Sequence, residues 1–295
     1  MPIDWLTLTM SNKDDQYMQA VQLSLDCLKS EAELGNMVQP HYGRGGFKGS
    51  KAGQIGVLQN DWGLQVQLSG GLADILARQY AYLPMRCTRI DIQATIDCAP
   101  YGGSRGVIEV DYRDAVAKNT RLQRKRKMKW VVDPFGGATF YVGSRESDTY
   151  CRVYEKGKQL GDTSLWEYLR YEVEFKGERA YTVWQQVAEM TRIKPESVDS
   201  AGIALIQRVF AERGVNVDYF LPDGSHTLVI DDTVSRQDTD VYRKLRWLAV
   251  SVAPTIRFLT QRGHEIDVIG ALGLSTIDEA NWDSGTVDGY AIGLV

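Results

Sequence analysis

Polar and less polar residues alternate along three segments of the chain, at residues 87–97, 149–156 and 168–176. Because successive side chains of a β-strand point to opposite faces of a sheet, each segment predicts a strand with an apolar back and a polar front. The three fronts share charged, amide, hydroxyl and phenolic side chains: Arg89, Asp91, Gln93, Thr95 and Asp97; Tyr150, Arg152, Tyr154 and Lys156; and Arg170, Glu172, Glu174 and Lys176.

The pattern along the rest of the chain predicts an alternation of helices with short strands. In the first half it predicts a strand at 4–10, a helix at 14–34, glycine-rich strands at 41–70, a helix at 71–82 and the strand at 87–97. Further along it predicts a helix at 110–127, strands at 129–133, 138–143, 149–156 and 168–176, and helices at 180–192, 197–213 and 238–262.

Runs of strands with hairpin-length connections, bracketed by helices, predict an α+β fold built mainly on an antiparallel sheet. We expect an α+β core at 1–185, whose halves at 1–98 and 106–185 resemble a diverged structural duplication without a sequence repeat. Residues 186–295 are expected to form a helical C-terminal region packed on this core, with a flexible tail beyond about 275.

Composition places the chain among ordinary globular proteins. It has 295 residues, of which 43% are apolar and 24% charged, and it contains no apolar run long enough for a bilayer. The N-terminal segment has no signal-peptide pattern, so we expect a cytoplasmic protein without membrane association. Four cysteines without a CxxC pair and three scattered histidines predict neither a disulfide framework nor a zinc site.

Charge is distributed unevenly along the chain. The net charge is −4, yet residues 113–129 hold eight basic residues and one acid. A focused basic segment on an acidic protein favours local contact with a DNA backbone, although a solvated helix or loop face is the alternative. The predicted DNA-binding residues are Arg121, Arg124, Lys125, Arg126, Lys127 and Lys129.

The polar fronts suggest a chemistry as well as a fold. Cations neutralise the charge of a phosphodiester, a phenolate can attack phosphorus and stay bonded to it, and carboxylates are hard ligands for Mg²⁺ or Mn²⁺. The alternative is the exposed polar face of an ordinary antiparallel sheet, in which the acids form cross-strand ion pairs with Arg89, Arg152 or Arg170.

Three segments in order, TRIDIQ, YVGSRESDTYCRVYEKG and LRYEVEFKGERA, resemble the replication initiation factor family, which includes rolling-circle plasmid and phage initiators and related relaxases of conjugative elements. The match covers about residues 85–180, and a weaker one begins at Asp4-Trp5-Leu6. The resemblance implies a bacterial-host enzyme that nicks single-stranded or hairpin origin DNA, with a divalent metal and a tyrosine that becomes linked to the 5′ phosphate. It also implies a host helicase as partner, and a homodimer is compatible with it.

Within this resemblance, the family motif places a tyrosine just before an acidic-Lys-Gly turn, which here makes Tyr154 the expected nucleophile and Tyr150 the alternative. Arg145, Arg152 and Lys156 are the expected phosphate contacts, although the turn at 143–147 is also explained as a hairpin connection.

Asp91 and Glu172 are the expected metal ligands, with Glu174 next along the same face. Asp97 is the remaining candidate, but it lies roughly 20 Å from Asp91 along a regular strand, which is too far for one ion. The sequence therefore predicts a metal-assisted DNA nickase and religase. A DNA-binding regulator that kept the fold without the chemistry, or a sheet protein without a nucleic-acid role, are the alternatives.

Overall fold

The computed structural model describes residues 3–121, 127–134, 136–217, 256, 259 and 261–263. The chain divides into two units, Met1–Asp231 and Asp232–Val295, and the fold described below belongs to the first. The helix predicted at 238–262 falls almost entirely outside the described residues, and the tail predicted beyond 275 lies wholly outside them.

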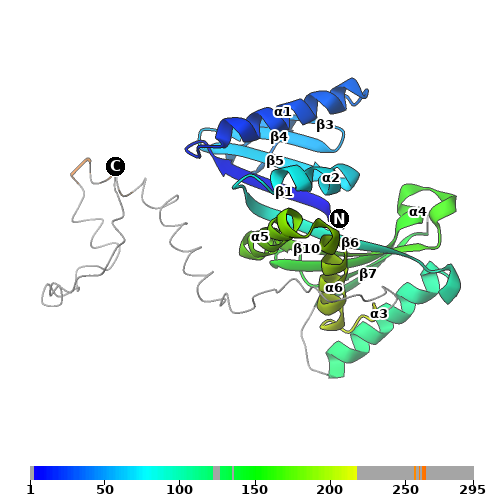
Figure 1. The fold of residues 1–295 in the computed structure, drawn as a ribbon. Helices are drawn as coiled ribbons and strands as arrows, with labels where there is room; N and C mark the ends of the chain where they lie inside the picture. Colours follow the sequence, from blue (N-terminus) through cyan, green and yellow to red (C-terminus); the bar gives the residue numbers. More distant parts are fainter. Residues whose placement is uncertain are drawn as a thin grey trace, which may run out of the picture. The chain divides into compact units, whose positions relative to one another are not determined.

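The described strands form one ten-stranded sheet with helices packed against it (Figure 1), which confirms the predicted α+β class. Its strands are β1 (Ile3–Ser11), β2 (Gln39–Tyr42), β3 (Lys48–Ala52), β4 (Ile55–Asn60), β5 (Gly63–Ser69), β6 (Arg86–Asp97), β7 (Met128–Val132), β8 (Ala138–Val142), β9 (Thr149–Glu155) and β10 (Tyr168–Lys176). The α-helices are α1 (Tyr17–Glu33), α2 (Gly70–Tyr80), α3 (Ser104–Arg121), α4 (Lys156–Leu160), α5 (Gly177–Ile193) and α6 (Val198–Ala211).

The strand order is β2-β3-β4-β5-β1-β6-β10-β9-β8-β7, which reads as two related halves joined at the antiparallel pair of β1 and β6. The unit β1-α1-β2-β3-β4-β5-α2 is repeated as β6-α3-β7-β8-β9-β10-α5, with α4 inserted before β10. The sequence prediction ended the first half at residue 98 and so included β6 in it. In the topology, β6 is instead the first strand of the second half. The predicted core boundary at 185 falls inside α5.

Two glycines mark equivalent points of the halves. Gly70 follows β5 and Gly177 follows β10, and both turn a strand directly into a helix with φ of 57° and 58°. This left-handed backbone is open to glycine without the steric penalty that a Cβ brings. The two halves can therefore be aligned at these positions.

The helices cover the apolar back of the sheet. Leu6, Leu8, Ile90 and Val173 point to this side and are fully or almost fully buried, and α2 packs on β1 while α5 packs on β6. In the described part of the chain, no helix is both long and apolar enough to cross a bilayer. The opposite face, which carries the alternating polar residues, is therefore the one left for a site.

Two elements differ from the sequence prediction. The third helix begins at Ser104 rather than 110, and a short helix, α4, begins at Lys156, where the strand was expected to continue. The strand ends there because Glu155 is fully buried and bonded to Ser104, Arg105, Lys158 and the backbone N–H of Ala138. Lys156 consequently lies at the end of the polar front rather than within it.

Candidate active site

Cross-strand register gathers the polar residues of the second half into adjacent rows, because directly opposed residues of antiparallel strands share a face. One row runs Tyr150, Glu174, Asp91 and Trp5 across β9, β10, β6 and β1. The next runs Lys129, Tyr141, Arg152, Glu172 and Gln93 across β7, β8, β9, β10 and β6. Residues far apart in the sequence thus meet on one face.

Three carboxylates form the centre of this face. Asp91, Glu172 and Glu174 are 0%, 1% and 6% exposed. Charges removed from water require compensation, so such a group is stable only when neighbouring cations or protons balance it.

Arginine and lysine supply that compensation. Arg89 donates to both oxygens of Asp91, at 2.9 and 2.6 Å, and lies 3.0 Å from Glu174. Arg152 contacts Asp91 at 3.3 Å and also pairs with Glu172. Lys176 lies 2.6 Å from Glu174. The cross-strand ion pairs considered from the sequence are therefore present at Arg89 and Arg152, whereas Arg170 pairs with Asp4 instead.

The carboxylates titrate differently although they are neighbours. Burial, helped by the charges of Glu172 and Glu174, outweighs the hydrogen bonds and charge of Arg89 and raises the pKa of Asp91 to about 7. Burial also acts to raise the pKa of Glu172, but Arg152 outweighs it and the net pKa is lowered. Glu172 is therefore the more readily ionised member of this pair, because its pKa is lowered whereas that of Asp91 is raised.

Tyr154 joins the cluster through its hydroxyl, which donates to Oε2 of Glu172 at 3.0 Å. Burial, followed by the charge of Glu172, raises the pKa of Tyr154 above its usual value. The Lys156 ammonium lies 5.7 Å from the centre of the Tyr154 ring. Tyr154 therefore has a proton acceptor and a cation beside it, but it ionises only when the acceptor takes the proton as a new bond forms.

Tyr150 occupies a different setting on the same strand. Its ring stacks on that of Tyr141, with centres 5.7 Å apart and planes at 14°. Burial raises the pKa of Tyr150, and a hydrogen bond with Arg145 partly offsets this effect. Arg145 thus contacts the alternative nucleophile, whereas Arg152 and Lys156 are next to the favoured one.

Asp97 is the predicted site residue that the fold leaves out of the cluster. It lies at the far end of β6, opposite Tyr168, and its carboxylate accepts the backbone N–H of Ala99 at 2.9 Å. Strand β6 continues without a break from Asp91 to Asp97, so the two carboxylates are separated along the strand as the sequence predicted, and they do not share one ion site.

Trp5 and Tyr141 are the neighbours that sequence reasoning missed. Trp5 lies under the Arg89 guanidinium, 4.8 Å from it, and Tyr141 supports Tyr150. Both lie in segments that resemble the family, Trp5 in Asp4-Trp5-Leu6 and Tyr141 at the start of YVGSRESDTYCRVYEKG, but the resemblance assigns neither to the site. Only their register with Asp91 and Arg152 reveals that they belong to this face.

The predicted DNA-binding residues are dispersed. Arg124, Lys125 and Arg126 lie outside the described residues, and Lys127 is exposed just before β7. Lys129 is exposed in the row of Arg152. Their contact with DNA stays a prediction.

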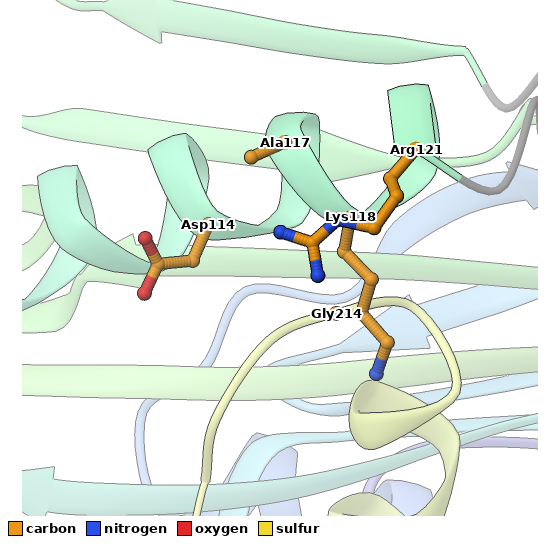
Figure 2. Close-up of a pocket in the computed structure, with 5 residues that line it drawn as sticks. All are labelled: Asp114, Ala117, Lys118, Arg121 and Gly214. Carbon is orange, nitrogen blue, oxygen red and sulfur yellow. The ribbon is translucent and has the colours of Figure 1, made fainter.

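Arg121 ends α3 and lines an open surface pocket of about 380 Å³ with Asp114, Ala117, Lys118 and Gly214 (Figure 2). Helix α3 packs on the back of the sheet, where the Asp111 carboxylate accepts from the Tyr171 hydroxyl at 2.6 Å. The pocket is therefore separated by the sheet from the carboxylate cluster, and we do not assign it to the same site.

Oxygen donors of three carboxylates on two adjacent strands are the chemistry that Mg²⁺ or Mn²⁺ requires. Among the described residues, no group of three His, Cys, Asp or Glu side chains is arranged to hold a metal ion, since these oxygens face Arg89, Arg152 and Lys176. The oxygen ligands are therefore of the type that such an ion prefers. To bind it, the carboxylates would have to release their ion pairs with the arginines and the lysine.

The match to known proteins defines the class. The model of the replication initiation factor family matches residues 88–270, which contain the three carboxylates and both tyrosines. The chain belongs to this family. Among solved structures, it is similar to a rolling circle replication initiator protein from Geobacillus stearothermophilus, with 20% identity over 68% of this chain and 82% of that chain and a TM-score of 0.47. No curated protein matches it.

Proposed function

We propose that this replication initiation factor is a DNA nickase and religase that starts rolling-circle replication, or the transfer of a mobile element, through a covalent 5′-phosphotyrosine. The observation that carries the proposal is the Tyr154–Glu172 hydrogen bond within a cluster of carboxylates and cations. A phenol beside a charged base, with cations around it, suits attack on a phosphodiester.

In the proposed step, the Tyr154 oxygen attacks phosphorus in line with the bond to the 3′ oxygen. Glu172 takes the phenolic proton as the new P–O bond forms. The P–O3′ bond breaks, and the leaving oxygen takes a proton from solvent water to become a 3′ hydroxyl that can prime a polymerase. Attack of a 3′ hydroxyl on the phosphotyrosine reverses these events and rejoins DNA.

The neighbouring cations have a defined part in this step. Arg152 and Lys156 would offset charge that grows on the phosphate oxygens, and Arg145 would do so from the side of Tyr150. Asp91, Glu172 and Glu174 are the residues that would hold Mg²⁺ or Mn²⁺, which when bound polarises the phosphate as a Lewis acid. The position of the Tyr154 hydroxyl and the transfer of its proton depend on Glu172 rather than on the metal.

The wider setting of the proposal is a bacterial cytoplasm, with origin DNA presented as a single strand or hairpin and a host helicase separating the strands. A plasmid, a phage and a conjugative element are all compatible hosts of such a gene. A homodimer is likewise compatible with the reaction, since each chain carries its own Tyr154.

A non-catalytic DNA-binding regulator is the second candidate, favoured by the burial of both tyrosines, each 6% exposed. The test is to incubate the protein and Mn²⁺ with labelled single strands that tile the origin of its own replicon. We expect a protein–DNA adduct that survives denaturation. Binding of the same strands without any adduct, in Mn²⁺ and in Mg²⁺, would establish the regulator.

A further inference from the structure

Strands β2 and β3 form the outer edge of the first half, where β2 is the edge strand and β3 pairs with both β2 and β4; we call residues 39–52 the edge ribbon. It carries Arg44, Lys48 and Lys51, and residues 34–60 contain no acid. Within the described part of the chain, none of these three cations forms an ion pair. The charge of the edge ribbon is therefore available to a partner.

The edge ribbon presents different side chains on its two faces. Tyr42 and Lys48 are directly opposed and share one face, and Tyr42 is 70% exposed. His41 and Lys51 point to the other face, which is continuous with the polar front of the sheet. A partner that lies along the open edge of β2 would meet a cation on either face of the sheet.

The tip of the edge ribbon is held in place. Asn60 donates to the carbonyl of Gly45 at 3.0 Å, and the Gly43 N–H donates to Phe47 at 2.9 Å. Asp61 in the adjacent turn and Glu31 near the base of the edge ribbon are acids of the neighbouring elements. Arg44 is thus presented from an ordered turn.

The two halves of the sheet have diverged in chemistry. Alignment at Gly70 and Gly177 matches Thr7 to Asp91 and Gln67 to Glu174. The same alignment places Leu58 at the position of Arg152 and Asn60 at that of Tyr154. The first half therefore keeps the frame of the candidate site but has neither its acids nor its tyrosine.

We propose that the edge ribbon binds duplex DNA that flanks the cleaved strand, so that one half holds DNA while the other cuts it. The phosphates of a duplex that lies along this sheet edge can be contacted by cations from both faces of the edge ribbon, and such contacts position the DNA without reading its bases. This inference rests on the proposed function, because it takes the bound DNA to be the DNA that is nicked.

The test compares R44Q/K48Q/K51Q with wild type and with K13Q/R78Q/K194Q, which removes the same charge from exposed positions outside the edge ribbon. Binding is measured by fluorescence anisotropy against salt, on a short single strand that spans the nick and on the same strand extended by a duplex arm. Each lost phosphate contact on B-DNA flattens the log–log salt slope by about 0.9, so we expect a change of up to about 3 on the duplex-armed probe.

The expected result is weaker binding and a flatter slope for the ribbon variant on the duplex-armed probe alone, with melting temperature and adduct formation on the short strand unchanged. Equal losses on the two probes, equal losses in the control variant, or no loss would each overturn the proposal. The last outcome would assign the lysines to protection of a sheet edge from self-pairing. Failure of wild type to form any adduct would refute the nicking chemistry, and the anisotropy comparison would still judge the edge ribbon.

Discussion

At the scale of single residues, the candidate site depends on how protons and charge are shared among buried groups. Arg152 outweighs burial and lowers the pKa of Glu172, which accepts from Tyr154, while burial raises the pKa of Asp91 to about 7. One carboxylate is thus prepared to take a proton.

Replacing Tyr154 by Phe removes only the attacking oxygen. We expect loss of the covalent adduct, with DNA binding retained and the melting temperature close to that of wild type, as judged by denaturing gel, anisotropy and thermal melting. Tyr150→Phe is the matched control on the same strand and should still form the adduct. The reverse pattern would move the nucleophile to Tyr150.

Replacing Asp91 by Asn mimics the protonated carboxyl, which is the form that burial favours. We therefore expect little change in melting temperature but at least a ~100-fold loss of nicking in Mn²⁺, as is typical when a group needed for the chemical step is removed. Single-turnover nicking rates measure the effect. Should stability fall by several kcal/mol while nicking persists, Asp91 belongs to a structural ion pair.

Asp111 gives the fold a pH dependence away from the site. Burial, helped by the charge of Asp114, outweighs the hydrogen bond from Tyr171 and raises the pKa of Asp111 to about 7. The folded state therefore binds this proton more tightly than the unfolded state, so the stability it contributes is complete below about pH 4 and is lost as pH rises to about 7.

Asp111→Asn keeps an acceptor for Tyr171 and removes this titration. We expect the variant to melt at nearly the wild-type temperature at pH 4 and above the wild-type temperature at pH 8, in thermal melts across that range. A constant difference between the two proteins at every pH would show that Asp111 does not titrate in this window.

At the scale of elements, α4 fixes the end of the strand that carries Tyr154. Glu155 is bonded to α3, to Lys158 and to the start of β8, so the residue next to the tyrosine cannot shift. Gly157 allows α4 to lie directly against the backbone of Leu165. The geometry of this turn therefore depends on the absence of a side chain at Gly157.

Gly157→Ala places a Cβ against the Leu165 carbonyl. We expect a loss of about 1–3 kcal/mol in the free energy of unfolding and slower nicking, because the strain displaces the end of β9. Gly106→Ala in α3 is the control, since its Cβ meets nothing within 4 Å, and helix propensity predicts a gain of up to about 1 kcal/mol. Urea unfolding measures the free energy of unfolding of both variants. A Gly157→Ala protein as stable as wild type would show that the turn accommodates the added Cβ.

At the scale of the whole molecule, the pairing of β1 with β6 joins two related halves into one sheet. Leu6, Leu8 and Ile90 at this junction are completely buried. Separation of the halves would expose these side chains and two unpaired strand edges. Each half is therefore expected to need the other.

Dividing the chain between Leu83 and Pro84 tests this dependence. We expect fragments 1–83 and 84–295 to be unfolded or aggregated alone and to form a stable complex when coexpressed, as monitored by circular dichroism and size-exclusion chromatography. Independent, cooperative melting of either fragment would contradict a shared core.

Alternation along the chain was sufficient to predict the strands that carry the site and the face on which each residue lies. Strand periodicity is a local property of neighbouring residues, so it placed Asp91, Glu172 and Tyr154 on polar faces, whereas their expected roles came from the resemblance to the replication initiation factor family. The same reasoning placed Asp97 too far from Asp91, as the fold shows.

The tertiary structure alone decided which strands are neighbours and in which register. It assigned β6 to the second half, brought Trp5 and Tyr141 to the carboxylates, and ended β9 before Lys156. These outcomes depend on pairing and burial between segments distant in sequence, such as Glu155 with Ser104 and Ala138. Local periodicity contains no information about such partners, because the free energy that selects them arises only when the whole sheet is assembled.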